Sequence, residues 1–243
     1  MIINPYVFAS GPAPFGGAVS TANLVEWWPL SEASGTRAGV HAGLDMTDTN
    51  TVTGVSGGGP DGSDVSQFTA ANSEWLERNS EAALQTGDIS HTWVAWFRVT
   101  NLSTLRTIFG KDSSTAGQRE YYMGVVSDGR IFFNVFRATD AAVQPILPVG
   151  TIVINTWYFV AGWHDASADT ASIEINANGT INTVATGGAL QAASSAKFEI
   201  GARQYPSNTF PFDGQIQRVG FWKRVLTSGE RTALYNSGNG LDY

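Results

Sequence analysis

The feature that most constrains the fold is a series of short apolar runs between residues 24 and 225, separated by turn-forming residues. Two of the separators contain Asp128-Gly129 and Asn178-Gly179, pairs that supply the positive φ angles of a tight hairpin. Short strands spaced about ten residues apart are typical of a β-sandwich or barrel rather than of βαβ units. The runs predict strands at residues 24–30, 65–69, 74–78, 91–99, 105–111, 120–127, 130–137, 151–154, 156–164, 170–177, 180–186, 197–202 and 214–223.

Some of these runs have large apolar side chains on both faces. In the run 91–99, Trp93 and Phe97 point to one side, and Val94 and Trp96 point to the other. A strand that is buried on one face only would alternate apolar with polar residues. We therefore expect central strands whose outer face is covered by loops or by a second layer.

One short helix is expected after the last strand. Thr227 and Glu230 have the spacing of a capping box, and Gly238 can end the helix. The residues alone therefore predict a single all-β domain with one short helix at its edge.

Composition excludes several classes of protein. The 243 residues have a net charge of −7 and no basic cluster, so we expect no nucleic-acid partner. The absence of cysteine excludes thiol catalysis, zinc–thiolate sites and disulfides. No apolar run reaches the ~18–20 residues of a membrane-spanning helix, so we expect no membrane span. The first eight residues lack a basic start and contain Pro5, so we expect no signal peptide there.

Residues 1–22 form a distinct segment in which Pro5, Pro12 and Pro14 exclude regular structure. The segment is also apolar, and two interpretations stay open: a frayed tail, or an extended arm that docks on another subunit. The second interpretation predicts an arm over residues 1–22 and a domain over residues 23–243. The residues expected to anchor this arm are Ile2, Ile3, Tyr6, Val7 and Phe8.

Six blocks of sequence, in order, resemble a known family of domains. They lie at residues 24–35, 68–76, 92–97, 156–165, 212–216 and 222–240. The blocks resemble laminin-G-like domains of the concanavalin A-like lectin/glucanase superfamily, of the kind found in bacteriophage virion proteins. This resemblance implies an all-β fold, an antiparallel two-sheet jelly-roll sandwich with one short C-terminal helix. Gln217 stands where the family usually has an acidic residue, so no acidic site is carried over to that position.

Glucanases on the resembled fold place two or three carboxylates on one face of a strand, as nucleophile and acid. The nearest match here, residues 174–178, keeps Glu174 and has Asn176 and Asn178 in place of further carboxylates. A lone carboxylate cannot fill both roles. We therefore expect no catalytic residues and no enzymatic activity, with Glu174 facing solvent.

The resemblance also implies a calcium ion at the rim of the sandwich, bound by carboxylates and carbonyl oxygens. Aspartates occur in suitable loops, although none has the dense spacing of a calcium loop, and Asp is common in ordinary turns. The metal ligands stay unknown, no cofactor is required, and Ca²⁺ stays an open alternative. The aspartates are Asp45, Asp48, Asp61, Asp64, Asp165, Asp169 and Asp213.

An aromatic residue in a polar loop can provide a platform on which the flat apolar face of a sugar stacks. Tyr205 is such a residue, with Arg203 and Asn208 in the same loop, and His164 adds a polar group at a strand end. We expect these four residues at a glycan-binding site. For Tyr205 the alternative is simple loop packing.

Two functions stay open. The first is a non-catalytic structural and adhesion protein of a bacteriophage virion. Its arm would bind other virion subunits, it would be oligomeric in the particle, and its domain would bind host-surface glycans. The alternative is a carbohydrate-binding module or lectin of a secreted bacterial protein, located outside the cell. An arm ordered against another protein favours the first function, and a monomeric domain that binds sugar favours the second.

Overall fold

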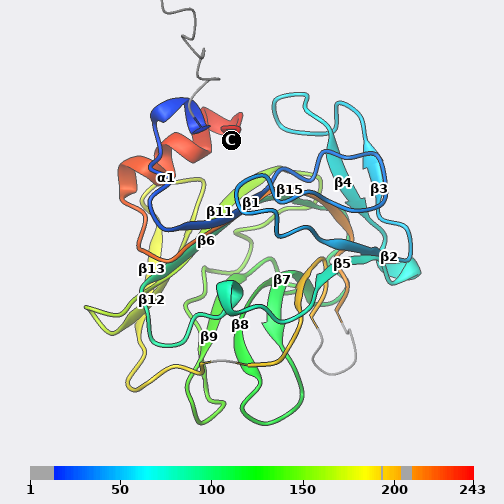
Figure 1. Cartoon of the computed structure of the whole chain (residues 1–243). Helices are drawn as coiled ribbons and strands as arrows, with labels where there is room; N and C mark the ends of the chain where they lie inside the picture. Colours follow the sequence, from blue (N-terminus) through cyan, green and yellow to red (C-terminus); the bar gives the residue numbers. More distant parts are fainter. Residues whose placement is uncertain (1–13, 193, 204–209) are drawn as a thin grey trace, which may run out of the picture.

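Two antiparallel sheets pack face to face in the computed structural model, which describes residues 14–192, 194–203 and 210–243 (Figure 1). The first sheet consists of β1 (Leu24–Trp28), β3 (Thr53–Val55), β4 (Val65–Phe68), β6 (His91–Val99), β11 (Tyr158–Asp165), β12 (Thr170–Ile175), β13 (Ile181–Ala185) and β15 (Gly214–Trp222). The second consists of β2 (Thr47–Thr49), β5 (Trp75–Arg78), β7 (Arg106–Asp112), β8 (Arg119–Val125), β9 (Ile131–Phe136), β10 (Ala142–Val143) and β14 (Phe198–Ile200).

The strand order is β13-β12-β11-β6-β15-β4-β3 in the first sheet, with β1 also paired to β15, and β10-β9-β8-β7-β14-β5-β2 in the second. A short helix, α1 (Ser228–Tyr235), follows the last strand. This arrangement confirms the predicted all-β, antiparallel two-sheet sandwich with a C-terminal helix. Among the described residues, no helix is long and apolar enough to cross a membrane.

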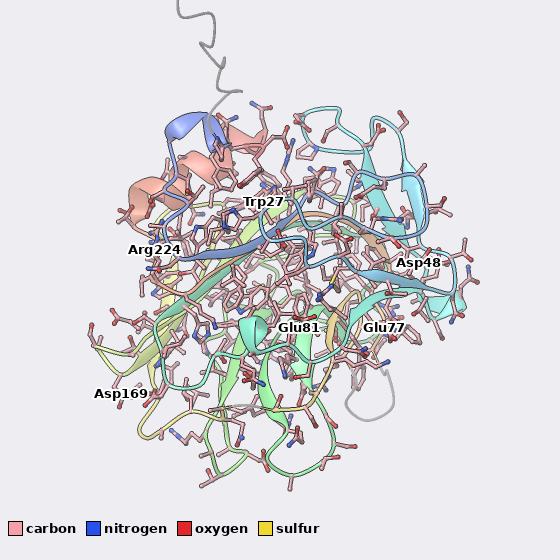
Figure 2. All side chains as sticks on the ribbon, viewed as in Figure 1. Trp27, Asp48, Glu77, Glu81, Asp169 and Arg224 are labelled. Atoms are coloured by element: carbon pink, nitrogen blue, oxygen red, sulfur yellow. The ribbon has the colours of Figure 1, made fainter. Side chains whose placement is uncertain are left out.

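Aromatic side chains fill the space between the sheets (Figure 2). Trp93 of β6 and Phe221 of β15 stack with their ring centroids 4.1 Å apart, and Phe198 of β14 stacks on Trp93 from the second sheet at 5.0 Å. These rings are fully buried, and aromatic burial of this kind dominates core energetics. The stack therefore ties the two sheets into one unit.

Strand β15 changes its neighbour part of the way along one edge. Residues 214–216 pair with β4, whereas residues 219–222 pair with β1. Between them the register against β6 shifts, and Arg218 has a φ of 51°. A bulge of this kind bends a strand and redirects its side chains. The gap between β1 and β4 leaves part of β15 uncovered by a neighbouring strand.

A second apolar layer covers the outer face of the first sheet, as the strands with two apolar faces predict. Trp27, Trp96 and Trp222 lie on that face and pack against residues of α1 and of η1 (Pro14–Gly17). Phe15 of η1 is fully buried, with its ring centroid 5.0 Å from that of Trp27 in a T-shaped contact.

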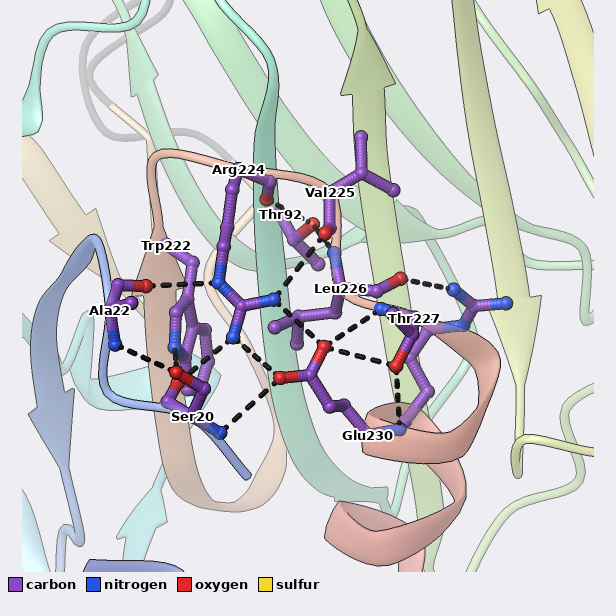
Figure 3. A network of polar contacts seen from close by, with 10 residues as sticks. Ser20, Ala22, Thr92, Trp222, Arg224, Val225, Leu226, Thr227 and Glu230 are labelled. Atoms are coloured by element: carbon purple, nitrogen blue, oxygen red, sulfur yellow. Dashed lines mark hydrogen bonds and ion pairs between the residues drawn. The ribbon is translucent and has the colours of Figure 1, made fainter. Parts of the chain in front are cut away.

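A polar network fastens the N-terminal segment to the start of α1 (Figure 3). The Glu230 carboxylate accepts from Arg224 at 2.6 and 2.8 Å, from the Thr227 amide at 2.9 Å and from the Ser20 amide at 3.3 Å. Arg224 also donates to the carbonyl oxygens of Ser20 and Ala22, each at 2.9 Å. Both bonds of the predicted capping box are present.

The structure corrects the predicted boundary between arm and domain. Residues 14–22 belong to the domain, because Phe15 and Val19 are buried on it and Ser20 is bonded to the start of α1. The apolar side chains of this half of the segment therefore find their partners within the same chain. The residues expected to anchor an arm, Ile2, Ile3, Tyr6, Val7 and Phe8, lie outside the described residues.

One local expectation also fails. Residues 151–154, predicted as a strand, form a loop in which Val153 and Ile154 are 56% and 45% exposed, because Pro148 and Gly150 turn the chain just before them.

Candidate functional site

Arg203, one of the residues predicted to bind a glycan, follows β14 and lies on the outer face of the second sheet. Its guanidinium lies 4.1 Å above the ring of Tyr122 and donates to Asp112 at 2.8 Å. Arg119 donates to the other oxygen of Asp112, also at 2.8 Å. Arg203 is only 6% exposed, so it belongs to a packed and charge-paired cluster.

His164, another predicted glycan-binding residue, is fully buried in β11. Its Nδ1 lies 3.0 Å from the carbonyl oxygen of Thr170, and its Nε2 lies 3.2 Å from a carboxylate oxygen of Asp88. The ring of His91 is its neighbour, with centroids 5.6 Å apart. Both nitrogens of His164 are therefore occupied inside the protein.

The structure does not bring Arg203 and His164 together. Arg203 stacks on Tyr122, whereas His91, the neighbour of His164, contacts Tyr121. Consecutive residues of a strand point to opposite faces, so the two predicted residues lie on opposite sides of the second sheet. The other two members of the predicted set, Tyr205 and Asn208, lie outside the described residues.

The expectation that Glu174 faces solvent is wrong. Its side chain is 5% exposed and accepts from Arg231 Nε at 2.6 Å, which joins β12 to α1. Its other oxygen accepts from the Gly179 amide at 2.9 Å. The guanidinium of Arg231 also covers the ring of Trp163 at 4.3 Å. Glu174 is thus a structural partner of the helix.

Another pair of carboxylates lies on the outer face of the second sheet, where Glu199 is opposite Glu77. Burial, together with the charge of Glu77, raises the pKa of Glu199 to about 8. Burial also raises the pKa of Glu77, but donors from Lys197 at 2.7 Å and Trp75 at 3.1 Å lower it overall. Glu199 is 1% exposed and both Glu77 oxygens have protein donors, so a glycosidic bond has no access to this pair.

The aspartates considered for calcium do not converge. Asp48 and Asp169 lie on opposite sides of the molecule (Figure 2). Asp48 accepts from the amide of Val52, and Asp165 from that of Ser167, as in ordinary turns. No group of three or more His, Asp or Glu side chains that could hold a metal ion is present in the described ranges.

A cavity of about 340 Å³ opens where β15 changes neighbour. Segments that are distant in sequence surround it: the loop after β1, the loop before β4, the β15 bulge and the C-terminal residues. This volume lies at the small end of the range for ligand pockets. The lining residues are Pro29, Ser31, Val40, Ser63, Asp64, Gln217, Arg218, Asp242 and Tyr243.

Gln217 is 1% exposed, and the Nε2 of its carboxamide has no hydrogen-bond partner among the described residues. Its Oε1 lies 3.1 Å from the Ser63 hydroxyl, which lies 2.6 Å from Asp61 Oδ1. Burial raises the pKa of Asp61, but bonds from Arg218 and Ser63 lower it to about 2, so the ionised carboxylate takes the single hydroxyl proton. The buried carboxamide is therefore incompletely bonded, at a cost of about 1–3 kcal/mol.

Arg218 connects the walls of the cavity. It is 2% exposed and donates to Asp61 at 2.5 Å, to Asp242 at 2.7 Å and to the carbonyl oxygen of Asn239 at 2.9 Å. Its φ of 51° is uncommon for a non-glycine residue, and such strain persists where the surroundings hold it. A Cβ at Gly240 would lie 2.3 Å from Arg218 Nη1, so this approach requires glycine.

The opposite wall is held by a buried carboxylate. Glu26 accepts from the backbone amides of His41 at 2.7 Å, Ala42 at 3.1 Å and Leu44 at 2.7 Å. The His41 Nδ1 in turn lies 2.8 Å from the Tyr243 hydroxyl. Both walls are therefore set before any ligand binds, which lowers the entropy that binding would lose.

The pocket combines a carboxamide, hydroxyls and carboxylates with the ring of Tyr243, which is 37% exposed. These groups can bond to a ligand that has several hydroxyl groups and one flat apolar face. The sequence analysis does not predict this site, because its residues come from distant segments. Its one signal is Gln217, at a position where similar domains usually have an acidic residue.

The model of a laminin G family, described as the concanavalin A-like lectin/glucanases superfamily, matches residues 71–230. That match spans well over half of the chain, so the chain belongs to this superfamily. No curated protein shows significant similarity to it.

Solved structures share the fold at low sequence identity. The binding domain of Paraclostridial Mosquitocidal Protein 1 matches with a TM-score of 0.70 and 13% identity, over 89% of this chain and 52% of that one. This chain thus spans about half of that domain. Domain 4 of AbnA, an extracellular arabinanase from Geobacillus stearothermophilus, in complex with arabinotriose, matches at 0.62 and 15%, over 87% and 97%. The Ruminococcus gnavus IT-sialidase CBM40, bound to α2,3 sialyllactose, matches at 0.52 and 16%, over 60% and 83%.

Proposed function

We propose that the protein is a non-catalytic, lectin-like module that binds carbohydrate in the pocket at the β15 bulge. The observation that carries this proposal is the Gln217 carboxamide, which is buried in the lining of the pocket without a full set of partners. A sugar hydroxyl both donates and accepts a hydrogen bond, so it completes the carboxamide whichever end of the group it meets.

Other features support the same ligand class. The half-exposed ring of Tyr243 offers a stacking surface beside the polar groups. Two of the similar structures hold an oligosaccharide, arabinotriose in one and sialyllactose in the other. The fold alone does not assign a function, so the pocket and not the likeness is the basis of the proposal.

The non-catalytic part of the proposal rests on the carboxylates. Glu174 is paired with Arg231, and Glu199 lies beneath the surface beside a fully bonded Glu77. Glycosidases need two accessible carboxyl groups on either side of the scissile bond. Purified protein is therefore expected to release no reducing ends from arabinan, β-glucan or xylan, and release that disappears in Glu199→Gln would contradict this.

Two settings for such a module stay as proposals. In the first, residues 1–13 attach the domain to other subunits of a bacteriophage particle, where it is oligomeric and binds host-surface glycans. In the alternative, it is a carbohydrate-binding module of a secreted bacterial protein, as in the extracellular arabinanase whose domain shares the fold. Deleting residues 1–13 distinguishes them: the first predicts loss of assembly at unchanged melting temperature, and the second predicts a monomer before and after deletion.

The carbohydrate proposal is tested with Gln217→Met, which keeps the length of the side chain and removes its hydrogen bonds. The matched control is Gln67→Met, because Gln67 is half-buried on β4, donates to the adjacent Phe68 carbonyl and does not line the pocket. A glycan array identifies the bound saccharide, and calorimetry measures its affinity. We expect loss of one to two hydrogen bonds to weaken binding about tenfold or more in Gln217→Met, with no change in the control. Equal binding by both variants, or binding of no saccharide, would contradict the proposal.

A further inference from the structure

The charged groups of the pocket point to a narrower ligand class. Asp64, Asp242 and Arg218 line it, and Asp61 lies behind Arg218. These three carboxylates and one guanidinium leave a net negative charge at the site. The whole chain, at −7, has the same sign.

Arg218 does not offset this charge for a ligand. Its Nε donates to Asp242, its Nη2 to Asp61, and its Nη1 to the carbonyl oxygen of Asn239. All three nitrogens are therefore engaged within the protein, and two carboxylates already neutralise the guanidinium. These bonds use three of its five N–H groups, and an acidic group on a ligand would meet a guanidinium whose charge Asp61 and Asp242 already balance.

Asp64 adds a further acceptor to the lining of the pocket. One oxygen accepts from the backbone amide of Gly57 at 3.1 Å, and within the described ranges no basic side chain forms an ion pair with it. Its side chain is exposed at the mouth of the cavity. An anionic ligand would be repelled by this carboxylate, whereas a hydroxyl group would donate to it.

A cationic ligand fits less well than a neutral one. An ammonium group would satisfy the carboxylates, but it can only donate, so it would complete the Gln217 carboxamide only where the oxygen end of that group faces the pocket, whereas a hydroxyl completes it at either end. Neighbouring hydroxyl groups on one sugar ring meet both demands, because one accepts from Gln217 while another donates to Asp64.

On the basis of the proposed function, we propose that this pocket selects uncharged saccharides and rejects acidic ones such as uronic acids, sialosides and sulfated sugars. We therefore expect the pocket to bind a neutral oligosaccharide and not a sialylated one, although similar structures hold ligands of both kinds. In this proposal Gln217 selects a ligand that carries hydroxyl groups, and Asp64 disfavours a ligand that carries a negative charge.

The test compares neutral saccharides with acidic counterparts: galactose and glucose with galacturonic and glucuronic acid, which differ only in the C6 carboxylate, and lactose with 3′-sialyllactose, which adds one sialic acid. We expect the acidic member of each pair to bind about tenfold or more weakly, since a like charge within about 5 Å costs this much at intermediate dielectric. Asp64→Asn should reduce the ratio of neutral to acidic affinity about three- to tenfold, while the affinity for the neutral saccharide changes little.

The matched control is Glu81→Gln, which removes the same charge from a surface ion pair with Arg78 next to β5. This variant should leave the ratio of neutral to acidic affinity unchanged. The comparison separates the local effect of Asp64 from that of the overall charge of the protein.

The outcomes separate the two proposals. The neutral-ligand inference is overturned if acidic saccharides bind as well as neutral ones, or if Asp64→Asn leaves the ratio of their affinities unchanged. The proposed function still stands in either case, provided that binding depends on Gln217. If binding does not depend on Gln217, the pocket is not the site and both proposals fail. Side-chain amide signals of Gln217 in ¹⁵N-labelled protein give an independent readout, and they should shift with the neutral saccharide alone.

Discussion

Strand β15 is associated with two arginine-centred networks that differ in how completely their neighbours are bonded. Around Arg224, just past the end of the strand, the Glu230 carboxylate, the Ser20 backbone and the start of α1 are all joined. Around Arg218, in the bulge, every nitrogen of the arginine has a protein partner, but the Nε2 of the adjacent Gln217 carboxamide has none among the described residues. The bulge residue also has a strained backbone, whereas the Arg224 network contains a regular helix cap.

The difference indicates two tasks. A fully bonded network leaves no buried polar group unpaired, so its bonds give a net gain in folding stability. A buried group without a partner lowers stability, and at the wall of a pocket a ligand can supply the missing partner. We therefore expect changes around Arg224 to alter stability, and changes at Gln217 to alter binding.

The largest effect should come from Phe15, whose ring is fully buried against Trp27 and Trp222 next to the Arg224 network. Phe15→Ala should lower the free energy of unfolding by about 3–5 kcal/mol, the usual cost of truncating a buried aromatic side chain. Urea denaturation measures it. Val149→Ala, at a side chain that is 68% exposed, is the control and should change little. An unchanged midpoint for Phe15→Ala would place residues 14–22 outside the domain.

Acid should weaken both networks. Hydrogen bonds from Arg224 lower the pKa of Glu230 to about 2, and the pKa of Asp61 is also about 2 because bonds from Arg218 and Ser63 outweigh burial. A depressed carboxyl pKa stabilises the fold above the unfolded value and loses that contribution as the pH falls toward the folded value. Stability should be nearly flat from pH 7 to 5 and lower by about 1–2 kcal/mol at pH 3, once solvent screening of these partly exposed groups is allowed for. Urea midpoints at pH 7, 5 and 3 test this, and a constant midpoint would contradict it.

Glu230→Ala isolates the Arg224 network. It removes the ion pair with Arg224, the reciprocal bond of the capping box and the bond to Ser20. We expect a loss of about 2 kcal/mol at neutral pH, and a smaller acid-induced loss than in the wild type. Glu81→Ala removes a more exposed ion pair with Arg78 and should cost less than about 0.5 kcal/mol. Equal losses in the two variants would mean that the network adds nothing beyond a surface pair.

Much of the fold follows from the sequence, because local signals and tertiary packing agree. The alternation in residues 91–99 predicts a strand buried on both faces, and β6 is that strand, with Trp93 in the core and Trp96 under the second layer. Thr227 and Glu230 predict the helix cap that is found. Residues 151–154 mislead, because their β-branched side chains suggest a strand while Pro148 and Gly150 place them in a turn.

The candidate site could not be predicted in the same way. Arg203 and His164 are polar residues near strand ends, and nothing local in the sequence shows that Asp112 and Asp88 pair with them. The pocket depends on β15 exchanging β4 for β1 as its neighbour, which is a property of the topology. Gln217 becomes a candidate binding residue only because that exchange leaves it buried beside a cavity, and the sequence alone does not show this.

Gln217→Met should have the smallest effect on stability, and it is the variant that best separates a ligand-binding role from a structural one. Gln217→Met replaces an incompletely bonded polar group with an apolar group of similar length in the same cavity wall. If Gln217 is retained for a ligand, the variant should unfold no more easily than the wild type and gain up to about 1 kcal/mol, because the buried amide no longer goes unpaired. It should lose saccharide binding at the same time, which is the opposite of the pattern expected for Glu230→Ala.

Urea denaturation of Gln217→Met with and without the saccharide measures both properties in one experiment. The wild type should become more stable as the saccharide concentration rises, because the ligand binds only the folded state. The variant should not gain stability. A loss of more than about 1 kcal/mol in Gln217→Met without ligand would show that the carboxamide has structural partners, such as the Ser63 hydroxyl at 3.1 Å, that matter more than any ligand. The contrast between the two arginine networks would then reflect packing alone, because both would serve only to hold the fold.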